Sequence, residues 1–377
     1  MNNAPLSKVF KNTATSYKFL FFKTILDILG LTGNLKEKRT TIELKQFYLF
    51  FLVNSWYPIS TFKLSFGKQD MLPTFVTKLK LNSEDKRLLS HDIDYYDLDR
   101  ILIHNQDSYY KEVFDTLDKY VKYRFLTPYM EERLRGVNDP QRNAKIRDLL
   151  EKDFKSAKKF PYHFKNENGV EYLIINPSFD EFISSNFVVI YDWWKWNFAE
   201  YLSKHNPLTP SILFKMESPK KRKLVYARNY WNTVISLNGG SIKCIYSGKI
   251  ISKPVSLDHF LPWSFLPNDK TWNIIPTTGS INSSKSDNLP IRDYLENFID
   301  FQIESLSLYV ANLNKPSKGT LTNTVLEDEF RFKESTSLLS LLSDKSIKKT
   351  FQNTILNYYN LAEEQGFAAT WKYSQAL

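Results

Sequence analysis

The chain has 377 residues, of which 42% are hydrophobic and 15% aromatic, and this composition excludes a disordered protein and allows two or three folded domains. Lysine and arginine outnumber aspartate and glutamate by 51 to 41, which favours a polyanionic partner, either nucleic acid or an acidic membrane surface. The single cysteine, Cys244, excludes an internal disulfide and a four-cysteine zinc site and suits a reducing compartment.

No segment of the sequence is predicted to enter a membrane. The most apolar run, Phe47–Val53, is far shorter than the roughly 20 residues that a spanning helix requires. The first residues, Met1–Ala4, lack a basic stretch followed by an apolar one, so no signal peptide is predicted. We therefore expect a soluble, cytoplasmic protein with no membrane partner.

The N-terminal half of the sequence is dominated by helical periodicity. Ser16 is suited to cap a helix that begins at Tyr17, and Gly30 is suited to end it. The patterns that follow predict an apolar stripe over 113–125, a helix over 140–154, a hairpin with an Asn-Gly turn over 161–175 and a helix over 190–203. Residues 1–215 are therefore predicted to form a mostly helical domain that binds substrate or a partner.

A run of positive charge, Ser218–Lys223, is the sharpest change in composition and predicts a domain boundary. We expect residues 216–300 to form a second domain, which begins with a helix over 224–237. Residues 301–377 are predicted to be a helical region that packs on it, with a loop over 314–319. The expected fold class is mostly α, and α+β overall, with one small strand–strand–helix unit embedded in the second domain.

One motif in the second domain indicates a chemistry. Val255–Leu257 predicts a short strand that ends at Asp258 and His259. Consecutive residues at a strand end point to opposite sides, so one of this pair can bind a cation while the other faces a water molecule. Residues 272–276 predict the strand that returns beside the first.

A short helix after the second strand is expected to bring two more polar side chains to the same point. Asn282 and Lys285 are three residues apart and therefore share one face of this helix. The oxygens of Asp258 and Asn282 suit Mg²⁺ or Mn²⁺. The neutral imidazole of His259 is suited to take a proton from water, and Lys285 offers a positive charge to a phosphate.

This arrangement resembles the ββα-metal finger of the HNH endonuclease family, with Asp258-His259, then Asn273, then Asn282-x-x-Lys285. The resemblance implies that His259 is the general base and that Asp258 and Asn282 hold the metal ion. It also implies that Asn273 holds the loop bearing the histidine through backbone hydrogen bonds. The similarity is closest to the HNH domain of the RNA-guided CRISPR nuclease but covers only the finger, which indicates a free-standing bacterial HNH protein.

The finger lacks one feature that many HNH fingers have, namely two Cys-x-x-Cys pairs that bind a structural zinc ion. Cys244 is followed by Ser247 at the position of its partner, so no structural zinc is expected. We expect Trp263, Phe265 and Trp272 to brace the finger instead, by packing against the flanking helices.

The basic run upstream of the finger is a candidate contact for nucleic acid. It comprises Lys220, Lys221, Arg222 and Lys223, and the helix that follows carries Arg228. Positive side chains in this position suit phosphate contacts, but a solvated domain boundary gives the same pattern.

Together these patterns predict an endonuclease that depends on Mg²⁺ or Mn²⁺ and hydrolyses double-stranded DNA, in bacterial restriction or anti-phage defence. A one-metal finger attacks a phosphodiester without reading the sugar, so an RNA-cleaving nuclease is the first alternative. The second is a non-catalytic nucleic-acid-binding or regulatory protein that keeps the finger as a scaffold. A free nuclease endangers its host, so control by a regulatory protein partner or by substrate modification is expected, but no residue demonstrates it.

Overall fold

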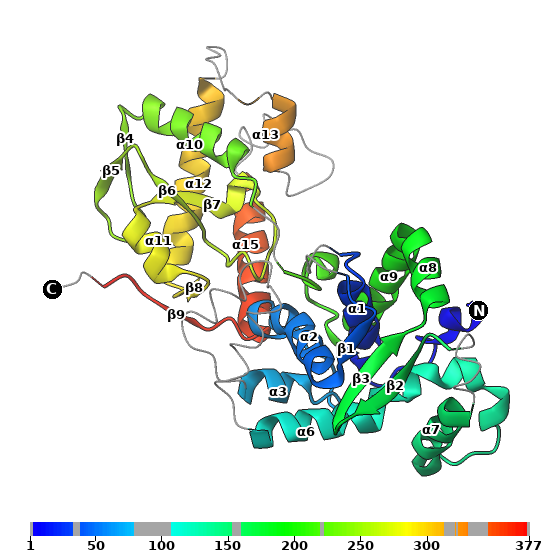
Figure 1. Ribbon diagram of the computed structural model, residues 1–377. Helices are drawn as coiled ribbons and strands as arrows, with labels where there is room; N and C mark the ends of the chain where they lie inside the picture. Colours follow the sequence, from blue (N-terminus) through cyan, green and yellow to red (C-terminus); the bar gives the residue numbers. More distant parts are fainter. Residues whose placement is uncertain are drawn as a thin grey trace. The chain divides into compact units, whose positions relative to one another are not determined.

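A computed structural model describes residues 3–32, 38–78, 107–152, 160–218, 222–312, 321, 323–330 and 346–374. The chain forms two compact units, of which the first contains residues 1–207 and 212–219 and the second contains residues 208–211 and 220–377. Helices predominate in both units and the sheets are small (Figure 1), so the prediction of a mostly α, α+β protein is confirmed. Across the described ranges, no helix has both the length and the hydrophobicity that a membrane crossing requires.

The first unit is built from helices around a small sheet. Its helices are α1 (Tyr17–Ile28), α2 (Leu44–Trp56), α3 (Leu72–Lys78), α6 (Asp107–Leu117), α7 (Arg142–Lys152), α8 (Pro177–Ser185) and α9 (Phe187–His205). Short 3-10 and π segments cover Ala4–Lys8, Tyr57–Thr61, Asp118–Lys122, Arg124–Met130, Glu132–Leu134, Asp139–Gln141 and Ile212–Phe214. The helices predicted over 17–29, 140–154 and 190–203 are confirmed, with shifted ends.

The sheet of the first unit has three antiparallel strands in the order β1-β3-β2. Its strands are β1 (Thr41–Glu43), β2 (Tyr162–Glu167) and β3 (Val170–Ile175). Asn168 and Gly169 have φ angles of 51° and 86°, which is the backbone of the tight hairpin turn that an Asn-Gly pair favours. The predicted hairpin over 161–175 is therefore confirmed.

The apolar stripe over 113–125 is buried, but it does not form one continuous helix. Helix α6 ends at Leu117, a π segment covers 118–122, and a 3-10 segment that contains Pro128 follows. The four residues of the stripe are completely buried: Val113, Leu117, Val121 and Phe125. The apolar side chains of this segment are therefore buried together, although its backbone changes from α-helix to π and then to 3-10 geometry.

The second unit contains short strand pairs covered by longer helices (Figure 1). Its helices are α10 (Val225–Leu237), α11 (Gly279–Lys285), α12 (Tyr294–Ala311), α13 (Asn323–Glu329) and α15 (Ser346–Glu364), and a 3-10 turn covers Thr271–Asn273. The strands pair as β4 (Ser241–Lys243) with β5 (Ile250–Ser252), β6 (Ser256–His259) with β7 (Ile274–Thr277), and β8 (Leu289–Pro290) with β9 (Ala369–Trp371).

Strands β6 and β7 and helix α11 follow one another in the order that the motif predicts. The two strands are antiparallel, with His259 opposite Ile274. The hydroxyl of Thr278 caps α11 by accepting a hydrogen bond from the backbone N–H of Ile281 at 3.3 Å. Helix α11 contacts β6, so the end of this strand and one face of the short helix lie side by side.

Helices α10 and α12 hold the strand pair in place by polar as well as apolar contacts. Trp231 of α10 and Gln302 of α12 each donate a side-chain N–H to the backbone carbonyl of Ile274, both at 2.9 Å. Phe260, directly after β6, stacks on Phe298 of α12 with ring centres 4.0 Å apart. A small strand pair is thus anchored to a helical core that supplies the burial it could not achieve alone.

The aromatic side chains that were expected to brace the finger behave differently from one another. Trp272 stacks on Tyr358 of α15 with ring centres 6.1 Å apart, and Phe265 is completely buried. The ring of Trp263 is only half-buried and lies 5.6 Å below the guanidinium of Arg222. Trp272 and Phe265 are therefore buried, and Trp263 is the partly exposed member of the three.

The C-terminal segment does not stay helical to its end, although the sequence pattern indicated that it would. Gly366 has a φ angle of 89° just after α15, and strand β9 then pairs in parallel with β8. The carbonyl of Trp371 accepts a hydrogen bond from the backbone N–H of Ile291 at 2.9 Å. A strand of three residues is too short to show a period of two, which explains the wrong prediction. The loop predicted over 314–319 lies outside the described residues.

Candidate active site

Asp258 and His259 are the last two residues of β6, and both side chains are almost completely buried. Their exposed fractions are 2% and 4%. Because successive side chains of a strand alternate between its two faces, each residue has its own set of partners. The partners of Asp258 come from the short helix α11 and from the turn between β4 and β5, and the partner of His259 comes from the loop between β6 and β7.

The carboxylate of Asp258 is held between two hydrogen-bond donors. The hydroxyl of Tyr246 donates to Oδ2 at 2.7 Å, and the ammonium of Lys285 donates to Oδ1 at 3.2 Å. Burial, followed by the negative charge of Asp258, raises the pKa of Tyr246 well above its ordinary value. Tyr246 therefore stays protonated and remains a donor. The sequence motif contained no indication of this residue.

Lys285 occupies the interior of the site, where the sequence suggested a surface contact with phosphate. Its side chain is completely buried. The ammonium also donates to the backbone carbonyl of His259 at 2.6 Å. One cation thus holds the carboxylate of Asp258 and the backbone carbonyl of the next residue.

His259 is paired with a carboxylate that sequence reasoning missed. Its Nε2 lies 3.1 Å from Oδ1 of Asp269, whose other oxygen accepts a hydrogen bond from the backbone N–H of Lys223. Burial raises the pKa of Asp269, but the hydrogen bonds from His259 and Lys223 outweigh it and the net shift is downward. Asp269 is therefore ionised and can only accept a hydrogen bond, so Nε2 of His259 is the donor in this contact.

Asn273 makes the backbone contacts that the motif predicts for it. Its amide group donates to the carbonyl of Leu261 at 3.0 Å and accepts from the N–H of the same residue at 2.9 Å. Its backbone carbonyl accepts from the N–H of Phe260 at 2.8 Å. Three hydrogen bonds from one completely buried residue fix the chain directly after His259.

Asn282 is oriented by its amide nitrogen. This nitrogen donates to the hydroxyl of Ser256 at 2.7 Å and to the carbonyl of Leu257 at 3.2 Å. The side chain is half-buried, and within the described residues no hydrogen bond engages its Oδ1. The amide oxygen is thus the group of Asn282 that remains able to bind a cation.

The donor set of this site fits a hard divalent ion. Asp258 and Asn282 both supply oxygen, and they are anchored on adjacent parts of β6 and α11. Among the described residues, no group of three or more His, Cys, Asp or Glu side chains is arranged around a common point. Two protein oxygens leave most of the coordination shell to water and phosphate, which suits Mg²⁺ or Mn²⁺.

Part of the basic run lies next to the histidine. Lys223 reaches the site through its backbone N–H, which binds Asp269. The side chains of Arg222 and Lys223 are exposed, as is that of Arg228 on α10. Two residues of the run, Lys220 and Lys221, lie outside the described residues.

Comparisons with known proteins agree with this geometry. Residues 242–291 match the family model of HNH endonucleases, and this segment contains β6, β7, α11 and the polar residues described above. A search of curated proteins and a search of solved structures each found no match. The resemblance of the finger to HNH endonucleases is therefore confirmed, and an HNH domain implies nuclease activity and nucleic-acid binding.

Proposed function

We propose that the protein is an endonuclease that hydrolyses DNA phosphodiester bonds with His259 as general base and one divalent ion as cofactor. The observation that carries this proposal is the buried Asp258-His259 pair, fixed by Lys285 and Asp269 inside the segment that matches HNH endonucleases. A pair of polar residues held this firmly is expected of a reaction centre, where orientation contributes to the rate.

In the proposed reaction, Nδ1 of His259 removes a proton from a water molecule. The oxygen of that water forms a bond to phosphorus, and the bond from phosphorus to the 3′ oxygen of the leaving strand breaks. The 3′ oxygen keeps the electron pair of that bond and takes a proton from solvent water. The ionised carboxylate of Asp269 keeps the proton on Nε2 and stabilises the imidazolium that forms. Lys285 holds the backbone carbonyl of His259, and Asn273 holds the two residues that follow it, so that the imidazole ring does not need to reorganise.

The proposed cofactor is Mg²⁺ or Mn²⁺, held by Asp258 and Asn282. When bound, such an ion supplies positive charge beside the scissile phosphate and the leaving oxygen. Calorimetric titration of Asp258→Ala with Mn²⁺ should show weaker binding than the wild type. Unchanged binding would remove Asp258 from the metal site.

The base is tested by His259→Ala, assayed with plasmid DNA and with total RNA in the presence of Mg²⁺ or EDTA. We expect cleavage of the plasmid to fall by roughly a hundred- to ten-thousand-fold, because general-base catalysis contributes about that factor. Circular dichroism should show an unchanged fold. Cleavage of RNA alone would replace DNA as the substrate, and a variant as active as the wild type would remove His259 from the mechanism.

We also propose that the activity serves restriction or anti-phage defence in the bacterial cytoplasm, on double-stranded DNA and under the control of a protein partner. The support for this proposal is that a nuclease whose activity is not controlled endangers its own host. Phage plating on cells that express the wild type or His259→Ala tests the proposal. Equal plating efficiencies would argue against a defence role.

A further inference from the structure

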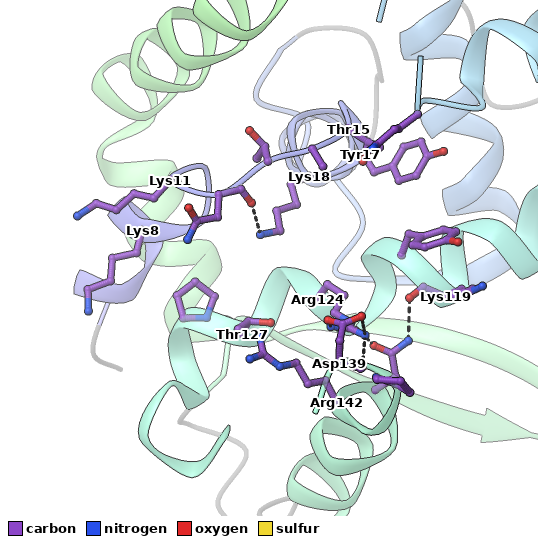
Figure 2. Close-up of a pocket in the computed structure, with 18 of the residues that line it drawn as sticks. Lys8, Lys11, Thr15, Tyr17, Lys18, Lys119, Arg124, Thr127, Asp139 and Arg142 are labelled. Atoms are coloured by element: carbon purple, nitrogen blue, oxygen red, sulfur yellow. Dashed lines mark hydrogen bonds and ion pairs between the residues drawn. The ribbon is translucent and has the colours of Figure 1, made fainter. Parts of the chain in front are cut away.

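The first unit contains a large pocket, and none of its lining residues belongs to the finger. Its volume is about 1110 Å³, slightly above the roughly 300–1,000 Å³ of typical small-molecule sites. The segment before α1 and the start of that helix form one wall, and the segments between α6 and α7 form the opposite wall (Figure 2). The pocket is therefore large enough for a ligand of several rings.

The lining of this pocket is strongly positive. Five lysines and two arginines face it, against one glutamate and one aspartate. Both carboxylates already have a cationic partner, since Glu131 pairs with Lys8 at 2.7 Å and Asp139 pairs with Arg124 at 2.5 Å. Within the described part of the chain, three exposed lining lysines make no ion pair: Lys11, Lys68 and Lys119. The pocket thus has an excess of cations that a bound anion would neutralise.

Lys18 is a lining cation that faces the pocket from α1. Arg124 belongs to the opposite wall, where its guanidinium is paired with Asp139 (Figure 2). The ammonium of Lys18 donates to the backbone carbonyls of Val9 at 3.3 Å and Asn12 at 3.2 Å, and no carboxylate of the described residues contacts it. Burial, followed by the charge of Arg124, lowers the pKa of Lys18. An anion bound beside Lys18 would supply the negative charge that this half-enclosed ammonium lacks.

An aromatic surface lies beside the positive charge. The ring centres of Tyr17 and Tyr120 are 6.3 Å apart, and Tyr120 is 50% exposed. The ammonium of Lys119 lies 4.9 Å from the centre of the Tyr120 ring. Aromatic rings next to lysines and arginines are the combination that binds stacked bases and their phosphates.

We propose that this pocket binds a phosphate-bearing nucleotide ligand. Its source is either a short single strand of nucleic acid or a free nucleotide, because both combine phosphate groups with planar bases. The charge excess accounts for the phosphates and the exposed tyrosine for a base. This binding site is separate from the proposed cleavage reaction, since the reaction uses no residue of the pocket.

The test measures binding to the full-length chain carrying His259→Ala, so that cleavage of the probe does not interfere. A fluorescein-labelled short single-stranded DNA is the probe, and ATP is the competitor. The pocket variant combines Lys11→Gln, Lys68→Gln and Lys119→Gln. The matched control combines Lys45→Gln, Lys111→Gln and Lys145→Gln, which are exposed lysines of the same unit outside the pocket.

We expect the pocket variant to weaken binding of the DNA roughly tenfold or more. The logarithm of the binding constant should also fall less steeply with the logarithm of the salt concentration. The slope should change by about 0.7 for each phosphate of the single strand that the replaced lysines neutralise in the parent. The control should stay within about twofold of the parent, because distant exposed charges are screened. Thermal unfolding of both variants should match the parent, since all six lysines are exposed.

The competition arm identifies the source of the ligand. Displacement of the DNA by ATP from the parent supports a free nucleotide, and DNA binding that resists ATP but is weakened by the pocket variant supports a nucleic-acid strand. Equal weakening by the pocket variant and the control would overturn the proposal, as would failure of both DNA and ATP to bind. These outcomes do not depend on cleavage, so they are distinguishable from a failure of the proposed nuclease.

Discussion

Lys285 illustrates how burial changes the role that a sequence position suggests. A lysine three residues after a metal-binding asparagine suits a phosphate contact, and nothing in the local sequence indicates that its side chain is buried. In the fold, α11 turns this face toward β6, and the ammonium binds Asp258 and the carbonyl of His259. The residue type was therefore predictable from the motif, whereas its partners follow from the packing of two elements.

Replacing Lys285 by methionine should destabilise the protein by about 3–5 kcal/mol, because removing one partner of a buried ion pair leaves the other charge without compensation. The destabilisation is measured by urea unfolding followed by tryptophan fluorescence. Lys249→Met, at an exposed position of the same unit, is the control and should change the free energy of unfolding by less than about 0.5 kcal/mol. Equal effects of the two substitutions would contradict the buried pair.

Asp269 should make a contribution to stability that disappears in acid. Its pKa in the folded protein is lower than the ordinary value of 3.8, so the folded state favours the ionised form. The contribution is present at pH values above 3.8 and is lost as the pH falls through the lower folded pKa. Asp269→Asn should therefore cost stability at neutral pH, and its difference from the wild type should shrink in acid. Urea unfolding of the wild type and of Asp269→Asn, at neutral and at acidic pH, measures this difference in stability. A difference that does not change with pH would contradict the prediction.

An element could be predicted from the sequence where the residues that determine it lie close together in the chain. The Asn-Gly hairpin and the strand that ends at His259 were predicted because their turn and termination signals lie within a few residues. Tyr246 and Asp269 were missed, because only tertiary packing brings them to the Asp258-His259 pair. Strand β9 was missed for the same reason, since its pairing with β8 joins residues far apart in the sequence.

Strand β9 should support the active site through Trp371. This ring contacts Tyr246 edge-on with ring centres 4.9 Å apart, and Tyr246 holds the carboxylate of Asp258. Trp371→Ala should lower the free energy of unfolding by about 3–5 kcal/mol, as expected for a buried tryptophan, and should also slow cleavage at temperatures where the protein remains folded. Trp196→Ala is the control, because that ring is 68% exposed. A Trp371 variant with full stability and activity would show that β9 does not support the site.

At the scale of the whole molecule, composition and local patterns predicted a helical protein, but they could not divide its positive charge between sites. Part of the excess lies around the pocket of the first unit, and part lies in the basic run next to Asp269 in the second. The sequence motif pointed only to the second, because lysines that are far apart in the sequence come together only in the fold. Binding of nucleic acid should therefore have two separable components.

The component that belongs to the basic run is isolated with a double-stranded probe. The run variant combines Arg222→Gln, Lys223→Gln and Arg228→Gln in the His259→Ala background. Glutamine at position 223 keeps the backbone N–H that binds Asp269, so the site should remain intact. We expect weaker binding of all sequences alike, with a salt dependence shallower by about 0.9 in the log–log slope for each duplex phosphate that these side chains neutralise in the parent.

The control for this variant combines Lys243→Gln, Lys249→Gln and Lys349→Gln, three exposed lysines of the same unit. It removes the same net charge, so any effect of overall charge on association is matched. A salt slope that changes only in the run variant assigns the phosphate contacts to Arg222, Lys223 and Arg228. If both variants keep the slope of the parent, the run is a solvated boundary and the duplex is held by other residues.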